Sequence, residues 1–273
     1  MKVRAALAEA ERRLAAIPGQ PRQDAELLMA HAIGVGVGEM QLRHLDAPSP
    51  PAFEPLLQRR LAREPVAYIT GRAGFWTIEL EVGPGVLIPR ADSETLIEAA
   101  MAHFRDQSPA RILDLGTGPG TLLLAALDQW PQAQGLGVDA DERALEHARR
   151  NAGALGLGER ARFERGDWAS GVEGRFNLVL CNPPYIRADA LLDADVHQWE
   201  PHGALFAGPD GLGAYRVLAP QIARMLAPGG IACVEIGDEQ LAAASRIFAA
   251  CGFTISSRVD LRGRDRCLML RLT

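Results

Sequence analysis

The sequence has few of the residues and segments that mark several classes of protein. It contains four cysteines and no Cys-x-x-Cys pair, which argues against a zinc knuckle or a redox dithiol and is typical of a reducing compartment. No apolar run reaches the ~18 residues that a membrane helix needs, and the six histidines show no metal-ligand spacing. We therefore expect a cytoplasmic protein with no metal site and no membrane segment.

Positive charge is not in excess, and lysine is almost missing. The chain has 29 Lys and Arg against 34 Asp and Glu, a formal charge of −5, and Lys2 is its one lysine. We attribute the arginine bias to an arginine-favouring genome. A protein that binds duplex DNA usually carries a net basic face, so this charge disfavours a direct nucleic-acid substrate. Glu9 and Glu11 interrupt the first apolar stretch, which predicts a helix of the folded protein and no signal peptide.

The hydropathy pattern divides the chain into a helical part and an alternating part. With 273 residues, 48% hydrophobic and 23% charged, the chain is predicted to form one large or two smaller globular domains. Apolar residues recur at intervals of three and four over residues 1–65, which predicts a helical bundle. Residues 66–90 predict a β-hairpin that ends at the segment VLIPR. We expect an N-terminal helical domain (1–70), a hairpin connector (71–90) and a C-terminal domain (91–273).

From residue 91 onward, apolar strands alternate with helices. A first helix is expected over residues 91–105, with Asp92 or Ser93 as its N-cap. The strands RILDL, GLGVD, ARFER, FNLVLC and IACVEIG follow, and helices separate most of them, which predicts a mostly parallel sheet covered on both faces. FTISSRVD and RCLMLRL are close enough in sequence for a terminal hairpin. The predicted fold class is α/β.

A glycine-rich segment, DLGTGPG at residues 114–120, follows the first of these strands and opens a helix. Small residues let the backbone approach a nucleotide-like ligand, and in an open α/β sheet ligands bind at the carboxyl ends of strands. The spacing is Gly-x-Gly-x-Gly, because position 121 is Thr, so the dinucleotide pattern Gly-x-Gly-x-x-Gly is missing. For the segment taken alone, a tight structural turn is the alternative.

Acidic residues at two later strand ends extend the candidate pocket. Asp139 follows Gly116 by 23 residues, and a carboxylate there can accept hydrogen bonds from both hydroxyls of a ribose. Capping the next helix is the alternative role for Asp139. In Gly166-Asp167-Trp168, Asp167 could receive an adenine amino group and Trp168 could line the ring, unless the motif is a capped turn with a packed indole. Together, the loop and Asp139 predict an adenosine pocket.

The run Asn182-Pro183-Pro184-Tyr185 stands directly after the apolar strand FNLVLC. Prolines donate no backbone hydrogen bond and restrict the chain, so two of them at a strand end indicate a fixed shape. A residue before proline is driven out of the helical region, which allows the Asn182 side chain and the Pro183 carbonyl to face one cleft. They are two acceptors for one planar NH2 group, with Tyr185 as a wall or stacking surface. A rigid turn with a buried tyrosine is the alternative.

In this order, the motifs resemble those of class I S-adenosylmethionine-dependent methyltransferases, and NPPY resembles the branch that methylates amino groups. Further segments narrow the resemblance to the PrmC/HemK family, which methylates the glutamine of the Gly-Gly-Gln motif in peptide chain release factors. These segments are EPVAYITGRAGFW, VLIPRADSETLIE, ILDLGTGPG, CNPPYI, WEPHGAL and GRDRCLML. The resemblance implies a Rossmann-like, mostly parallel seven-stranded sheet, preceded by a small helical bundle domain that recognises the substrate.

The resemblance also implies roles for individual residues. It assigns the binding of S-adenosyl-L-methionine to Gly116, Thr117, Gly118, Pro119, Gly120, Asp139, Trp168 and Asn182. Asp167 is a further candidate for binding this cofactor, because it precedes Trp168 and could receive the adenine amino group. The substrate glutamine would be bound by Asn182, Pro183, Pro184 and Tyr185, with Asn182, Pro183 and Tyr185 as the catalytic candidates. The implied partners are class I peptide chain release factors. Pro119 and Cys267 stand where family members commonly have other residues, and Pro119 removes one backbone donor from the loop.

Three other functions stay open on the sequence alone. An adenine-N6 methyltransferase of DNA or RNA would stack a flipped base on Tyr185, a glutamine methyltransferase could modify a ribosomal protein, and a non-catalytic protein could bind the cofactor alone. We expect catalysis mainly by positioning, because an amide nitrogen is a poor nucleophile and no strong base stands beside NPPY. Arg90 is predicted to contact a ligand or to form an interdomain salt link, and Arg262, Arg264 and Arg266 to form a solvated turn.

Overall fold

The computed structural model describes residues 1–272 and divides the chain into two compact units. Unit 1 contains residues 1–72 together with residues 192–199, and unit 2 contains the remainder of the described chain. The domain boundaries expected from the sequence place residues 192–199 in the C-terminal domain, whereas the structure groups them with the helical unit. No helix within residues 1–272 is long and apolar enough to span a membrane.

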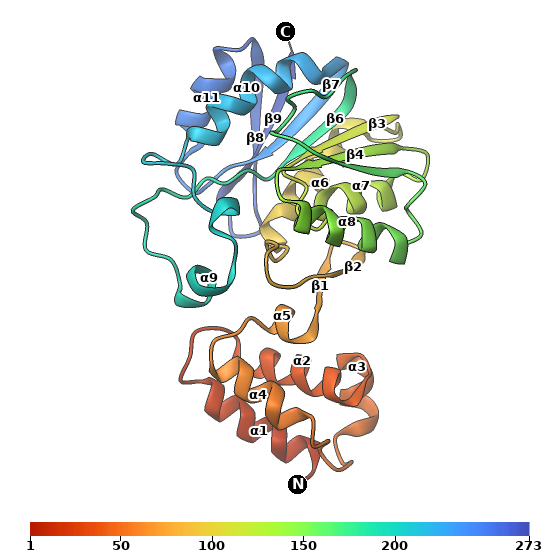
Figure 1. Ribbon diagram of the computed structural model, residues 1–273, viewed down its shortest axis with the longest axis vertical. Coiled ribbons are helices and arrows are strands. Elements are labelled where there is room, and N and C mark those ends of the chain that lie inside the picture. Colours follow the sequence, from red (N-terminus) through yellow and green to blue (C-terminus); the bar gives the residue numbers. More distant parts are fainter. Residues whose placement is uncertain (273) are drawn as a thin grey trace. The chain divides into compact units, whose positions relative to one another are not determined.

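Unit 1 is helical; Figure 1 draws its residues 1–72 in red and orange and its α9 in teal. Its elements are α1 (Val3–Leu14), α2 (Pro21–Ile33), α3 (Val37–Glu39), a π-helical turn (Met40–His44), α4 (Phe53–Leu61), α5 (Val66–Thr70) and α9 (Ala194–Trp199). Apolar residues three and four apart place one face of each long helix in a shared core. That core includes Val3, Ala6, Ala10, Leu14, Leu28, Met29 and Leu57. The predicted helical bundle is confirmed.

A buried arginine holds α9 to the other helices of unit 1. The Arg60 guanidinium donates to Asp24 of α2 and to Asp195 of α9, each at 2.8 Å. It also donates to the Pro18 carbonyl at 2.9 Å. A buried cation is tolerated only when acceptors surround it, and Arg60 meets that condition with one residue from the sequence-distant α9. The chain therefore passes between the units before and after α9 as well as at residue 72.

Unit 2 is built on a seven-stranded sheet with the order β5-β4-β3-β6-β7-β9-β8. Its strands are β3 (Arg111–Leu115), β4 (Gln134–Asp139), β5 (Ala161–Arg165), β6 (Phe176–Cys181), β7 (Leu226–Glu235), β8 (Phe253–Val259) and β9 (Asp265–Leu272). The first five in chain order pair in parallel, and β9 runs antiparallel to both β7 and β8. The predicted fold class and terminal hairpin are confirmed.

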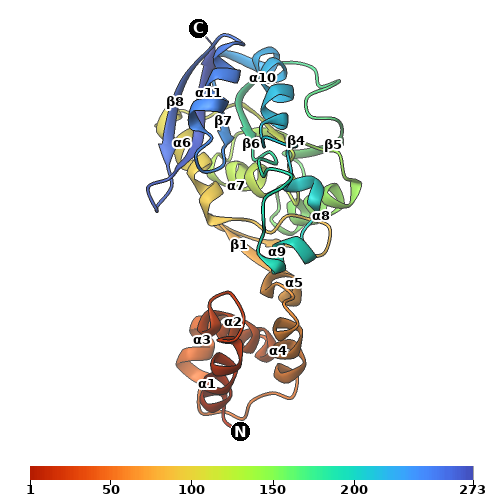
Figure 2. The same cartoon turned by 90° about the vertical axis from the view of Figure 1, so that its left-hand side faces the viewer.

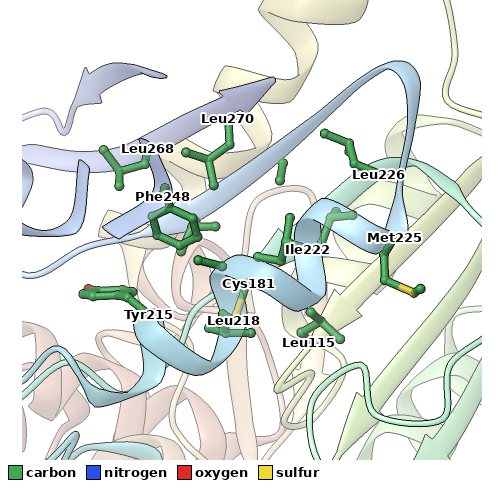
Figure 3. Packing of buried hydrophobic residues seen from close by; sticks show 14 of the residues in the cluster. Leu115, Cys181, Tyr215, Leu218, Ile222, Met225, Leu226, Phe248, Leu268 and Leu270 are labelled. Atoms are coloured by element: carbon green, nitrogen blue, oxygen red, sulfur yellow. The ribbon is translucent and has the colours of Figure 1, made fainter. Parts of the chain in front are cut away.

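Helices cover both faces of this sheet, as Figures 1 and 2 show. One face carries α6 (Glu94–Phe104), α7 (Thr121–Gln129) and α8 (Glu142–Ala154), and the other carries α10 (Gly213–Met225) and α11 (Leu241–Ala249). Residues 166–175, between β5 and β6, form turns instead of a helix. Figure 3 shows how α10 packs on the sheet; its labelled residues include Tyr215, Leu218, Ile222, Met225, Cys181, Leu268 and Leu270.

The connector differs from the expected hairpin in two places. Val66–Thr70 form the short helix α5, and the hairpin is limited to β1 (Arg72–Phe75) and β2 (Ile78–Glu81). Strand propensity at Val66–Thr70 is overridden because the helix buries Tyr68 and Ile69. The VLIPR segment (residues 86–90) is irregular, which leaves its backbone groups available to the site described below.

One buried asparagine of α8 ties the hairpin to the glycine-rich segment. Asn151 accepts a hydrogen bond from Glu81 N at 2.7 Å and donates to the carbonyls of Glu81 and Pro119 at 3.0 and 2.9 Å. A side-chain amide supplies donors and an acceptor at once, so this one group satisfies the edge of β2 and the loop together. The loop's position relative to the hairpin therefore depends on Asn151.

Replacing this amide should cost more stability than replacing an exposed one. Asn151→Ala removes three hydrogen bonds and leaves Glu81 N unpaired, so we expect a loss of about 3 kcal/mol in the free energy of unfolding. The control is Asn177→Ala, whose Oδ1 accepts from Ala110 N and Arg111 N at exposed positions and can be replaced by water. Urea unfolding of both variants tests this, and equal losses would contradict the anchoring role.

Candidate active site

A cavity lies at the carboxyl edge of the sheet, where the strand order reverses. β3 has β4 on one side and β6 on the other, and open α/β sheets bind ligands at such a switch point because the loops after the two strands diverge there. The cavity has a volume of about 580 Å³. Its wall comes from the VLIPR segment, the ends of β3, β4 and β6, the turn after β5 and residues 201–204.

The glycine-rich segment turns tightly against the end of β4. The amides of Gly116 and Thr117 both donate to the Val138 carbonyl, at 2.8 and 3.0 Å. Gly116 and Gly118 have φ values of +72° and +56°, the left-handed region that favours glycine. At Gly116 a side chain would also come within 3.2 Å of the Trp168 ring. Glycine there therefore serves both the turn and the close approach of the indole.

Four of the five predicted loop residues line the cavity: Gly116, Thr117, Gly118 and Pro119. Gly120 does not belong to the lining. It precedes α7 with φ of +87°, and a Cβ there would come within 2.8 Å of Leu124. The structure thus gives Gly120 a packing role between the loop and its helix.

Asp139, at the end of β4, supports the loop and lines the cavity. Its two carboxylate oxygens accept from Gly118 N at 2.8 Å and from Asp141 N at 3.0 Å, and burial is the main cause of its raised pKa. Each oxygen keeps a further lone pair for a ligand hydroxyl. The alternative role predicted for Asp139 was to cap the next helix. Asp141 has that role instead: it is the N-cap of α8, and its side chain accepts from Arg143 N.

Asp167 and Trp168 also line the cavity. Trp168 is half-buried and has a φ of +52°, which is uncommon for a bulky residue. The turn presents its ring to the glycine-rich segment, where a Cβ on Gly116 would meet it. Asp167 is exposed, so its carboxylate stands at the rim of the cavity.

Sequence reasoning assigned no role to Asp114, the buried acid at the end of β3. Its Oδ2 accepts from the Thr117 hydroxyl at 2.7 Å and from Leu123 N at 3.2 Å, whereas the buried Oδ1 has no hydrogen-bond partner within residues 1–272. Burial raises the pKa of Asp114 to about 7. Because Asp114 lines the cavity, it adds a second carboxylate to the wall. A charged residue inside the apolar strand RILDL was the available signal.

Only two of the four NPPY residues line the cavity. Asn182 and Pro184 line the cavity, while Pro183 is buried, Tyr185 is half-buried, and neither belongs to the lining. The Asn182 side chain donates through Nδ2 to the Ser93 hydroxyl at 3.0 Å. The Tyr185 hydroxyl donates to Glu235 Oε1 at 3.1 Å. The structure therefore points to Asn182 as the NPPY side chain best placed to meet a ligand.

Ser93 and Glu235 connect these two residues, and sequence reasoning missed this link. Ser93 was expected to cap a helix, but its side chain makes no capping bond; its hydroxyl donates to Glu235 Oε2 at 2.5 Å. Both are buried, at 2% and 1% exposure. Burial raises the pKa of Glu235 to about 7, and it also raises the pKa of the Tyr185 phenol. Tyr185 is therefore neutral at physiological pH.

Two arginine predictions are resolved by ion pairs within unit 2. Arg90 lines the cavity and pairs with the buried Glu200, which also accepts from Ile88 N at 3.2 Å, so Glu200 holds the VLIPR segment. The predicted solvated turn is wrong for Arg264 and Arg266. Arg266 is buried, and both arginines pair with Asp92, at 2.9 and 3.3 Å, because that turn packs against the start of α6.

Comparison with known proteins places this fold and site in a family. Residues 92–199 match the Methyltransferase small domain family and residues 5–71 match the PrmC N-terminal domain family. The release factor glutamine methyltransferase of Rhodospirillum rubrum is 44% identical over 260 residues, covering 92% of this chain and 79% of that protein. The chain belongs to the release factor glutamine methyltransferase family. The member from Cereibacter sphaeroides is 41% identical over 280 residues, covering 100% of this chain and 99% of that protein.

Membership in the release factor glutamine methyltransferase family confirms the resemblance seen in the motifs, and the protein is a methyltransferase. Solved structures share the fold. A 16S rRNA methyltransferase from Thermus thermophilus gives a TM-score of 0.55 at 19% identity, covering 74% of this chain and 50% of that chain. A ribosomal protein L11 methylase from Lactobacillus delbrueckii gives 0.52 at 20% identity, covering 71% and 86%. Within residues 1–272 no cluster of three His, Cys, Asp or Glu could hold a metal ion.

Burial of Asp114 should make its replacement increasingly favourable as pH rises. A carboxyl group whose folded pKa is about 7, against ~3.9 unfolded, contributes stability that is complete at low pH and lost as pH rises through 7. Asn keeps the acceptor for Thr117 and Leu123 but carries no charge. The unfolding free energy of Asp114→Asn relative to wild type should therefore rise by up to about 4 kcal/mol between pH 4 and 8.

Urea unfolding at several pH values measures this difference. The control is Asp128→Asn, whose carboxylate is exposed and accepts from the Thr77 hydroxyl; the pH-dependent change should be larger for Asp114→Asn than for this variant. A pH-independent difference for Asp114→Asn would contradict the burial of a titrating carboxyl.

Proposed function

We propose that this methyltransferase transfers a methyl group from S-adenosyl-L-methionine to the side-chain amide nitrogen of the Gly-Gly-Gln glutamine in class I peptide chain release factors. The family supports the reaction and the substrate class. For this chain, the carrying observation is Asn182. It lines the cavity at the end of β6, and its bond from Nδ2 to Ser93 leaves its carbonyl oxygen for an incoming NH2 group.

The cavity wall suits the proposed cofactor. The turn through Gly116 brings backbone close to the ligand space, Asp139 retains acceptor capacity for ribose hydroxyls, and the Trp168 ring supplies an apolar surface for adenine. The unpartnered Oδ1 of Asp114 offers a buried acceptor for the positively charged end of the cofactor. When bound, S-adenosylmethionine supplies an electrophilic methyl group on a sulfonium.

The residues around NPPY act on the substrate by orienting it. An amide nitrogen is a poor nucleophile because its lone pair is delocalised into the carbonyl. Asn182 Oδ1, and the Pro183 carbonyl as its expected partner, would accept the two amide hydrogens and hold the lone pair toward the methyl group. Fixing reacting groups at ~3 to 3.5 Å supplies several kcal/mol. The same acceptors stabilise the positive charge that grows on nitrogen.

No side chain beside Asn182 is needed as a base. The raised pKa of Tyr185 keeps its proton on the phenol, and its hydroxyl already donates to Glu235. Glu235 lies outside the cavity lining, with both oxygens occupied by Ser93 and Tyr185. The proton on the methylated nitrogen is acidic and can leave to water after transfer, so positioning accounts for the chemistry.

The helical unit is proposed to recognise the body of the release factor. Residues 5–71 match the PrmC N-terminal domain family, and Arg60 holds α9, the segment of chain that leads into the cavity wall at residues 201–204. Substrate binding and the wall of the site are thereby joined through one covalent segment.

Mass spectrometry tests the proposed reaction directly. Recombinant release factor is incubated with enzyme and S-adenosylmethionine, and a gain of one methyl group on the Gly-Gly-Gln glutamine is expected. Incorporation into adenine of DNA or RNA, with none into release factor, would instead favour the nucleic-acid reaction.

Truncating the acceptor should lower turnover more than cofactor affinity. Asn182→Ala is expected to reduce kcat by at least ~100-fold, about 2.7 kcal/mol, because the acceptor acts on the reacting amide. Calorimetry with S-adenosylhomocysteine should show a smaller change in Kd. Near wild-type single-turnover rates in this variant would refute the positioning role.

A short substrate should expose the contribution of the helical unit. A Gly-Gly-Gln peptide lacks the body of the release factor, so we expect its kcat/KM to be at least ~100-fold below that of the intact factor, with KM carrying much of the difference. Steady-state kinetics on both substrates provides the measurement. Equal kcat/KM values would show that the helical unit does not contribute to recognition.

A further inference from the structure

Four polar side chains form a hydrogen-bonded series that begins in the cavity wall, where Asn182 and Ser93 are lining residues, and continues behind it through Glu235 and Tyr185. Asn182 Nδ2 donates to Ser93 Oγ at 3.0 Å, Ser93 Oγ donates to Glu235 Oε2 at 2.5 Å, and the Tyr185 hydroxyl donates to Glu235 Oε1 at 3.1 Å. The residues come from three separate places: the turn before α6, the loop after β6 and the end of β7. One carboxylate therefore connects both ends of NPPY.

While Glu235 is ionised and can only accept, counting protons fixes the direction of each bond in this series. A serine hydroxyl has a single proton, and Ser93 gives it to Glu235. Toward Asn182, Ser93 can then only accept, so the NH2 group of Asn182 must face it. A carboxamide carries its oxygen on the opposite branch from its nitrogen, so Oδ1 is directed away from Ser93, and Asn182 is a lining residue of the cavity.

The opposite orientation of the Asn182 carboxamide would prevent it from binding the substrate amide. With its NH2 group toward the cavity, Asn182 would face the substrate's NH2 group, and two donors make no hydrogen bond. An isolated asparagine has nothing to exclude that flip. The Asn182 NH2 group thus needs a partner that accepts a hydrogen bond and cannot donate one. Ser93 is such a partner only while its own proton is donated to Glu235.

We propose that Ser93 and Glu235 are positioning residues, which lock the Asn182 carboxamide with its oxygen toward the substrate amide. Glu235, which lies outside the cavity lining, holds the Ser93 proton, and Ser93, in the cavity wall, acts on the substrate through the Asn182 NH2 group that it holds. Glu235 holds the Tyr185 hydroxyl as well, which fixes the other end of NPPY. This inference rests on the proposed function, because it assigns the orientation of the acceptor in that reaction.

Substitutions at Ser93 and Glu235 distinguish the proposed positioning role from a general packing role. Ser93→Ala removes the acceptor, so kcat should fall by at least ~10-fold while KM for the cofactor changes by less than about twofold. Ser93→Thr keeps the hydroxyl and should restore most of the rate. Glu235→Gln can keep its oxygen toward Ser93 and should retain more activity than Glu235→Leu. Thr95→Val, which alters a buried hydroxyl of α6 two residues from Ser93, should stay within about twofold of wild type.

A double-mutant cycle with Asn182 supplies the decisive kinetics. If Ser93 acts through Asn182, adding Ser93→Ala to Asn182→Ala should change kcat by less than about twofold, because nothing is left to orient. Wild-type kcat in Ser93→Ala, or a full ~10-fold loss in both backgrounds, would overturn the proposal.

A measurement without substrate keeps the inference separate from the reaction. The NH2 signals of Asn182 are identified in nitrogen-15 NMR spectra as those missing from Asn182→Ala. Their exchange with water should be slow in wild type and at least ~10-fold faster in Ser93→Ala, with no change in Thr95→Val. Unchanged exchange in Ser93→Ala would overturn the positioning role. If the exchange responds but release factor is never methylated, the proposed function fails and the positioning contact stands.

Discussion

The site depends on where one hydroxyl proton goes. Ser93 directs its proton to Glu235, and this makes Ser93 an acceptor for Asn182 and turns the Asn182 oxygen to the ligand. The two partners are 142 residues apart in sequence, so only the completed sheet brings them together. Acceptor chemistry at the cavity is thus a property of the assembled fold: it depends on Ser93 in the cavity wall and on Glu235, a buried group outside the cavity lining.

The rest of unit 2 holds that acceptor opposite a rigid ligand wall. The Val138 carbonyl and the Asp139 carboxylate accept hydrogen bonds from the glycine-rich segment. Asn151 donates to the Pro119 carbonyl of that segment, and Glu200 accepts from the VLIPR segment. Each contact uses a side chain or carbonyl at a strand or helix end, where the backbone leaves groups unpaired. Fixed backbone on both sides of the β3–β6 switch point is what allows catalysis by orientation without a base.

The sequence alone could predict the features that are encoded by neighbouring residues. The strands, the glycine-rich turn, Asp139 and NPPY are local patterns, and the structure places most of their residues around one cavity. Ser93, Glu235 and Arg266 carry no local signal, because their roles come from long-range pairing. Ser93 does stand at the N-cap of α6, but its hydroxyl bonds to Glu235 of β7 instead of capping the helix, and Arg266, predicted in a solvated turn, is a buried residue of β9. Gly120 was predicted to contact the ligand; the structure leaves it outside the cavity lining, where its missing Cβ makes room for Leu124. The membership of α9 in unit 1 had no local signal either, because the ion pairs of its Asp195 with Arg60 and Arg63 span more than 130 residues of sequence.

The central claim is that Asn182 presents its carbonyl oxygen to the substrate amide. A crystal structure of the protein with S-adenosylhomocysteine and a Gly-Gly-Gln peptide tests it most directly. The account predicts that the glutamine NH2 group lies within hydrogen-bond distance of Asn182 Oδ1 while Asn182 Nδ2 stays on Ser93. A peptide whose glutamine binds away from Asn182, or an Asn182 whose nitrogen faces the peptide, would contradict it.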